Sequence, residues 1–130
     1  MHEAHELEGL LMNSGLDYEA HAGGTWVVHN ESDHIDNVVI QFAPPVVVFR
    51  VKLMETPEDA SKRSALYERL LQLNATDMVA GAYALEGDAI VITETLQTEN
   101  LDNNELQAAV DGLSLAISEH YQELRGYLPA

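Results

Sequence analysis

Apolar residues recur at helical spacing in three segments of the chain. The first segment, 3–12, is apolar at every third or fourth position and is followed by Gly15, a typical left-handed helix terminator. A second helix is indicated from Thr56 to about Leu73, because Thr56 is a typical hydroxyl cap and Pro57 suits the first helical position. Both patterns predict amphipathic helices with one apolar face.

The third helix has the best-specified start. Asp102 and Glu105 can exchange capping hydrogen bonds, while Leu101 can pack on Leu106 as a hydrophobic staple. Gly126 follows the last apolar position and ends the segment. The apolar face of this predicted helix consists of Leu106, Val110, Leu113, Ile117, Tyr121 and Leu124.

Residues typical of β-strands fill the segments between these helices. Pro44-Pro45 ends one run, and Glu86-Gly87-Asp88 has the chemistry of a tight hairpin. The predicted strands are 25–29, 38–42, 46–53, 79–85 and 89–95. We therefore expect an α+β fold of order α-β-β-β-α-β-β-α: one domain over residues 1–130, with a curved antiparallel five-stranded sheet and helices packed on one face.

Apolar side chains are predicted on both faces of this sheet. In the run 46–53, alternation places Val47, Phe49, Val51 and Leu53 together on one face. The opposite face carries more apolar bulk than contact with solvent requires, although crossing loops or strand curvature could also cover it. We expect the surplus to contact a second copy of the chain or a client protein. The candidate residues are Trp26, Val28, Val46, Val48, Tyr67 and Leu71.

The charge of the chain narrows the range of partners. Its 130 residues include 22 Asp and Glu against 6 Lys and Arg, a formal net charge of -16. Such a surface repels nucleic acid and anionic membranes, so neither is an expected partner. A mimic of nucleic acid that occupies basic proteins remains an alternative. The chain has no cysteine and no secretory signal at Met1-His2-Glu3, so we expect a cytoplasmic protein.

Motifs for catalysis are absent from the sequence. No nucleophile elbow, phosphate-binding loop or dinucleotide fingerprint occurs, and the His2–His5 spacing is one residue short of the zinc hydrolase motif. We expect no enzymatic activity, cofactor, metal or catalytic residue. The alternative is a metal- or small-ligand-binding sensor or enzyme that uses acidic loops. Its candidate ligands are His29, Glu31, Asp33, His34 and Asp36.

The second half of the chain resembles a known family. The segments 70–74, 81–92, 101–106 and His120-Tyr121 are similar to the YbjN-like branch of the type III secretion chaperone-like fold. A leucine-rich helix ending in Leu73-Asn74, a short hairpin and a capped last helix recur together in that group. The chain departs from it at 75–80, which replaces the Pro-Phe-Gly-like stretch often found there.

The resemblance implies an acidic, dimeric, cytoplasmic bacterial protein without catalytic residues. Its secretion-chaperone relatives hold unfolded client segments along apolar grooves, whereas YbjN-like members are often linked to stress or regulation. The resemblance therefore favours a homodimeric, non-enzymatic protein-binding module that acts as a chaperone or a regulatory adaptor.

Overall fold

The computed structural model describes residues 3–30, 35–78 and 81–128. Its helices are α1 (Ala4–Ser14), α2 (Ala60–Thr76) and α3 (Asn103–Arg125). Its strands are β1 (Asp17–His21), β2 (Thr25–Asn30), β3 (Ile35–Ala43), β4 (Val46–Glu55), β5 (Ala82–Glu86) and β6 (Ala89–Gln97). They form one antiparallel sheet in the order β1-β2-β3-β4-β6-β5, so β1 and β5 are its edges.

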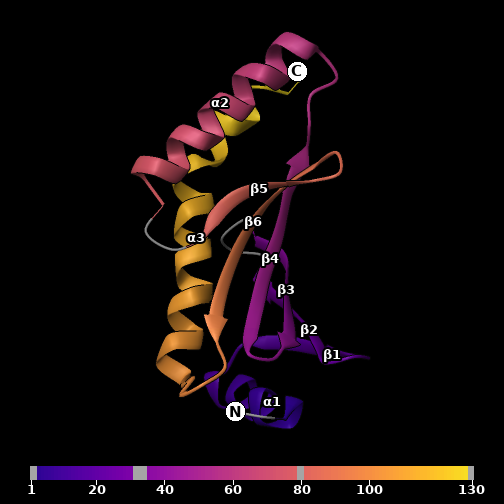
Figure 1. Cartoon of the computed structure of the whole chain (residues 1–130), viewed down its shortest axis with the longest axis vertical. Helices are drawn as coiled ribbons and strands as arrows, with labels where there is room; N and C mark the ends of the chain where they lie inside the picture. Colours follow the sequence, from indigo (N-terminus) through magenta and orange to yellow (C-terminus); the bar gives the residue numbers. More distant parts are fainter. Residues whose placement is uncertain (1–2, 31–34, 79–80, 129–130) are drawn as a thin grey trace.

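The helices lie at distinct places around this sheet. The long helix α3 runs along the molecule and contacts β3 and β6, while α1 and α2 lie toward opposite ends (Figure 1). The helix α2 contacts β5, and α1 contacts α3. The expectation that all three helices cover one face of the sheet stays a prediction. None of the helices in the described segments is long and apolar enough to cross a membrane.

The sequence analysis missed the edge strand β1, so the sheet has six strands and not five. This strand pairs with β2 across the Gly23-Gly24 turn, in which both glycines have positive φ. Only Tyr18 of its five residues is shielded from solvent, and the rest are exposed. Its residues alternate between polar and apolar, but only Tyr18 and Ala20 are apolar, and so short and weak a pattern does not stand out in the sequence.

The expected helix starts are correct for α3 and wrong for α2. The carboxylate of Asp102 accepts a hydrogen bond from the Glu105 backbone N–H at 2.8 Å, as predicted. In α2 the cap is Asp59, whose carboxylate accepts from the Lys62 backbone N–H at 2.9 Å. Thr56 lies outside the helix, and its N–H bonds the carbonyl of Asp88 in the neighbouring hairpin. A carboxylate nearer the first turn therefore took the role expected of the hydroxyl.

The core is one cluster of buried apolar side chains from the sheet and the helices. The strand β4 alternates as predicted, since Val47, Phe49 and Val51 are buried while their neighbours are less so. Apolar side chains of all three helices join them in one cluster. The largest fully buried side chains are Leu7, Leu11, Ile40, Phe49, Leu66, Leu73, Ile90, Ile92, Leu106, Leu113 and Ile117.

Trp26 and Val28 belong to this core, which corrects the expected assignment of sheet faces. Trp26 is opposite Ile40, which is in turn opposite the core residue Phe49, so the three share a face. Trp26 is only 4% exposed and Val28 is fully buried. Val46 and Val48 alternate with core residues and point the other way. The sequence analysis assigned Trp26 and Val28 to the same face as Val46 and Val48, because sequence alone does not fix the register between strands.

Gly81, which precedes β5, tests how closely this edge strand approaches β6. It has a φ of 76°, and an added Cβ would lie 2.5 Å from the Thr93 carbonyl oxygen. Gly23 has a similar φ of 77° but open space around it. We expect Gly81→Ala to lower the free energy of unfolding by about 1–3 kcal/mol more than Gly23→Ala, because only the former adds a clash. Urea denaturation of both variants measures the difference, and equal losses would contradict the close approach.

Candidate protein-binding surface

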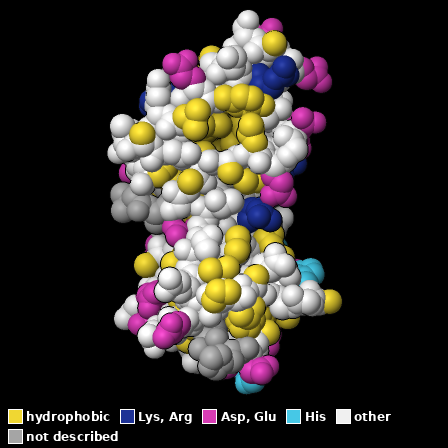
Figure 2. All heavy atoms as spheres, in the orientation of Figure 1, with side chains coloured by type: hydrophobic (Ala, Val, Ile, Leu, Met, Phe, Trp, Pro, Cys, Tyr) yellow, Lys and Arg dark blue, Asp and Glu magenta, His cyan; other side chains and the backbone are white. Residues whose placement is uncertain are grey.

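An apolar groove opens between α2 and the edge strand β5. It has a volume of about 310 Å³ and is lined by Tyr67, Leu70, Leu71, Asn74, Tyr83, Ala84 and Leu85. Leu71 is 69% exposed and Leu85 is 49% exposed, and both are among the few large apolar side chains at the surface. Figure 2 shows apolar side chains gathered where α2 and β5 lie in Figure 1. We call this feature the α2–β5 groove.

The amide of Asn74 holds the outer edge of β5. Its Nδ2 donates to the Tyr83 carbonyl at 3.1 Å, and its Oδ1 accepts from the Tyr83 N–H at 2.7 Å. One side chain thus supplies both hydrogen bonds that a neighbouring strand would otherwise make. Main-chain groups alternate in direction along a strand, so Leu85 is the next residue to direct its main chain to this edge. Among the described residues, β5 pairs with no strand except β6.

Beneath the groove, a chain of hydrogen bonds runs from the buried Tyr83 of β5 through His120 of α3 to Asp77, a half-exposed residue at the end of α2. The Tyr83 hydroxyl lies 2.7 Å from His120 Nδ1, and His120 Nε2 lies 3.3 Å from the Asp77 carboxylate. Tyr83 and His120 are 5% and 4% exposed. A neutral imidazole protonated on Nε2 satisfies every member, since it accepts from Tyr83 and donates to Asp77. Burial raises the pKa of Tyr83, which keeps its hydroxyl protonated as a donor.

An ion pair reinforces the same junction at the surface. Arg69 of α2 makes a two-pronged contact with Glu123 of α3, in which Nη2 is 3.1 Å from Oε1 and Nε contacts Oε2. The hydrogen bond from Arg69 lowers the pKa of Glu123. A planar guanidinium holding both carboxylate oxygens fixes direction as well as distance. The helix α2 is therefore held to α3 on one side and to β5 on the other.

The predicted candidates lie in three different places. Tyr67 and Leu71 line the α2–β5 groove, whereas Trp26 and Val28 are enclosed in the core. Val46 and Val48 are half-buried on the other face of the sheet. The structure thus brings together two of the six candidates in this groove.

The groove also contains residues that the sequence analysis did not select. Asn74, Tyr83 and Leu85 belong to the segments that carry the family resemblance, but nothing in their local pattern indicated a surface role. Alternation within β5 does not give the exposure of Leu85 either, because Leu85 shares a face with Tyr83, which is buried. The pairing of Asn74 with the edge of β5 had no signal in the sequence.

The expected cation-binding loop lies largely outside the described residues, because Glu31, Asp33 and His34 are not among them. His2 also lies outside the described residues. Within them, Glu19 Oε2 lies 3.7 Å from His21 Nε2 and 3.6 Å from His29 Nε2. In the described ranges, no group of three or more His, Asp or Glu side chains is placed to hold a metal ion. The metal-sensor alternative stays a prediction.

The comparison with protein families gives a match over nearly the whole chain. The CesT_Tir_1 family model matches residues 4–128. The chain belongs to this family. No curated protein sequence matches it significantly. The family match and the solved structures together confirm the YbjN-like, type III secretion chaperone-like fold indicated by the sequence.

Several solved structures share the fold at low sequence identity. YbjN from E. coli, described as a candidate transcription regulator, has a TM-score of 0.69 at 14% identity, with 93% of each chain covered. The ExoU-SpcU heterodimer from the type III secretion system of Pseudomonas aeruginosa gives 0.69 at 16% identity, covering 91% of this chain and 96% of the other. The Yersinia pestis chaperone SycH, bound to a fragment of YscM2, gives 0.59 at 19%, covering 88% and 98%.

Removing the Tyr83 hydroxyl tests the buried hydrogen-bond chain. Tyr83→Phe leaves a nitrogen of His120 without its partner in the interior, so we expect a loss of about 1–3 kcal/mol in the free energy of unfolding. Tyr67→Phe is the matched control, because the hydroxyl of Tyr67 has no hydrogen bond with the described residues, and its effect should stay within about 0.5 kcal/mol. Chemical denaturation measures both. Similar small losses in the two variants would show that the contact contributes nothing.

The carboxylate of Asp77 makes the junction sensitive to acid. Hydrogen bonds from Thr76 and then His120 lower its pKa, so its contribution to stability is present above the ordinary aspartate pKa and is lost as the pH falls through the lowered value. We expect wild type to be more stable than Asp77→Asn at pH 7, and the difference to shrink as the pH falls below the ordinary aspartate pKa.

Urea denaturation across this pH range measures that difference. Asp17→Asn removes the same charge from an exposed position on β1 and controls for the net charge of the chain. A gap between wild type and Asp77→Asn that stays constant with pH would contradict the assignment.

Proposed function

We propose that the chain is a non-enzymatic, cytoplasmic protein-binding module that pairs with a second copy through the α2–β5 groove and holds a segment of a client protein elsewhere. The observation that carries this proposal is the exposure of Leu71 and Leu85 beside the edge strand β5, which among the described strands pairs with β6 alone. Large apolar side chains grouped beside such an edge are typical of interfaces.

The geometry of the groove suits pairing between identical chains. A two-fold axis brings the same patch of each copy together, so α2 and β5 of one protomer meet α2 and β5 of its partner. Leu71 and Leu85 would then exchange solvent for apolar contacts. The edge of β5 at Leu85 offers main-chain groups for the same contact. The buried junction around His120 keeps this surface in one arrangement, which lowers the entropic cost of binding.

A client segment has separate surfaces available. Three structures with this fold are complexes of two different proteins: the ExoU-SpcU heterodimer, the HopA1-SchA chaperone-effector complex, and the chaperone SycH with a fragment of YscM2. In this chain, Val46 and Val48 are half-buried on the sheet face away from the core. The same face holds a hollow of about 440 Å³, in which Val39, Ala89 and Val91 lie among the polar side chains of Asn37, Arg50, Lys52 and Glu86. An extended segment laid on this face would cover apolar side chains that the protomer itself leaves accessible.

Substitution of Leu71 tests the pairing surface. We expect wild type to have a mass near twice 14.3 kDa by size exclusion with light scattering. Leu71→Glu should raise the dissociation constant of the dimer about tenfold or more, because it adds two charges at the centre of a two-fold contact in an already acidic protein.

Leu115→Glu is the matched control, because Leu115 is 57% exposed on α3 and lies outside the α2–β5 groove. It should leave the dimer intact, and circular dichroism should show that both variants are folded. A wild-type chain that is monomeric at micromolar concentration, or equal weakening by the two substitutions, would overturn the proposed interface.

A further inference from the structure

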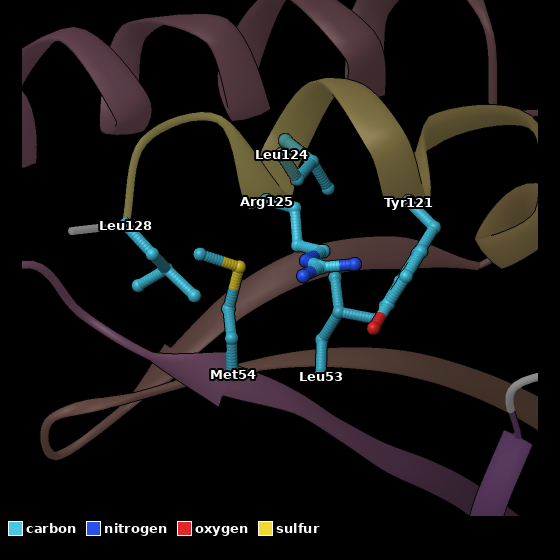
Figure 3. Close-up of a pocket in the computed structure, with 6 residues that line it drawn as sticks. All are labelled: Leu53, Met54, Tyr121, Leu124, Arg125 and Leu128. Carbon is cyan, nitrogen blue, oxygen red and sulfur yellow. The ribbon is translucent and has the colours of Figure 1, made fainter. Parts of the chain in front are cut away.

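A second apolar hollow lies where β4 and α3 end, outside the α2–β5 groove. It has a volume of about 280 Å³. Its lining residues are Leu53, Met54, Tyr121, Leu124, Arg125 and Leu128. Figure 3 shows Leu53 and Met54 of β4 directed toward the side chains of α3, with the Arg125 guanidinium among them. We call it the Arg125 pocket.

This pocket continues into a neighbouring hollow at the start of α2. This neighbouring hollow measures about 410 Å³ and shares the lining residue Leu128 with the Arg125 pocket. Its other lining residues are Thr56, Pro57, Glu58, Asp59 and Lys62. The carboxylates of Glu58 and Asp59 accompany Lys62 in this hollow, whereas Arg125 is the only charged side chain that lines the Arg125 pocket.

Those two basic side chains differ from the other cations of the chain. Arg63 donates to the backbone carbonyls of Pro57 and Glu58. Neither Arg125 nor Lys62 forms an ion pair with an acidic side chain of the described residues, and Arg125 is instead stacked 5.9 Å from the centre of the Tyr121 ring. The cations that do form ion pairs with glutamates are Arg50, Lys52 and Arg69.

An unpaired guanidinium in a pocket with an apolar wall fits a carboxylate that adjoins an apolar group. The guanidinium presents several N–H donors in a plane, which match the two oxygens of a carboxylate, while Leu53, Met54 and Leu128 offer apolar contact. Charge complementarity thus selects an acidic and apolar ligand over a basic one. The attraction of Arg125 for a carboxylate outweighs the repulsion from distant acidic residues, because salt screens charges more than about 8–10 Å away.

We propose that the Arg125 pocket binds a client segment that carries an apolar side chain next to an Asp or Glu. This inference rests on the proposed function as a protein-binding module and names the chemistry that one of its surfaces recognises. The net charge of -16 repels a client carboxylate over most of the surface, so the pocket is the place where that carboxylate is tolerated. A single favourable position of this kind fixes the register of an otherwise sequence-tolerant segment.

Titration with short peptides tests the proposal on the full-length chain. The probes are acetyl-Ser-Leu-Glu-Leu-Ser-amide and the same peptide with glutamine in place of glutamate, followed by the methyl resonances of Met54 and Leu128. We expect saturable shifts of both resonances and a dissociation constant at least about fivefold lower for the glutamate peptide, because only that peptide makes charge-assisted hydrogen bonds. The Arg125→Gln chain should bind the two peptides equally.

Arg50→Gln is the comparison variant, because it makes the same substitution in the hollow on the other proposed client surface, where Arg50 pairs with Glu86. It should retain the preference for glutamate. Equal binding of the two peptides to wild type, unshifted Met54 and Leu128 resonances, or an equal loss of preference in both arginine variants would overturn the proposal. The Leu71→Glu chain separates this result from the pairing surface, because a folded monomer should keep the preference. Equal binding of both peptides would remove the selectivity and leave the proposed dimer untouched.

Discussion

The arrangement of the surface depends on one constraint, which is that the polar groups of a buried Tyr83 must be satisfied. Its main chain is held by Asn74 of α2, and its hydroxyl meets His120 of α3. Burying such groups without partners would cost more than the packing around them gains. The partners come from two helices, so satisfying one residue of an edge strand also fixes where both helices lie. The α2–β5 groove has a defined shape because the hydrogen bonds of Tyr83 hold α2 and α3 in place against β5.

The parts of the fold that sequence predicts are those governed by neighbours along the chain. The cap of α3 at Asp102, the alternation along β4 and the apolar face of α3 all depend on residues a few positions apart. The strand β1 was missed because an edge strand buries little, and the face of Trp26 was misassigned because it depends on the register with β3. The contact between Tyr83 and His120 joins residues 37 positions apart, so local spacing carries no trace of it.

The candidate surface was predictable to a similar degree. Tyr67 and Leu71 were selected as part of an apolar surplus, and both line the groove. The choice of Trp26 rested on its size, and large aromatic residues serve a core as well as an interface. Pattern therefore identifies an excess of apolar residues more reliably than it identifies which of them the protomer leaves exposed. To tell buried apolar residues from exposed ones, one must know how the strands pair.

The last turns of α3 serve both surfaces at once. His120 and Glu123 face the junction with α2 and β5, whereas Tyr121 and Arg125 face the Arg125 pocket. Leu124 lies between them and is almost fully buried, so this stretch is anchored to the core. Helical periodicity makes the two roles compatible, because residues one or two positions apart point in different directions. A short stretch of one helix can thus hold the α2–β5 groove in shape and present a basic side chain to the separate Arg125 pocket.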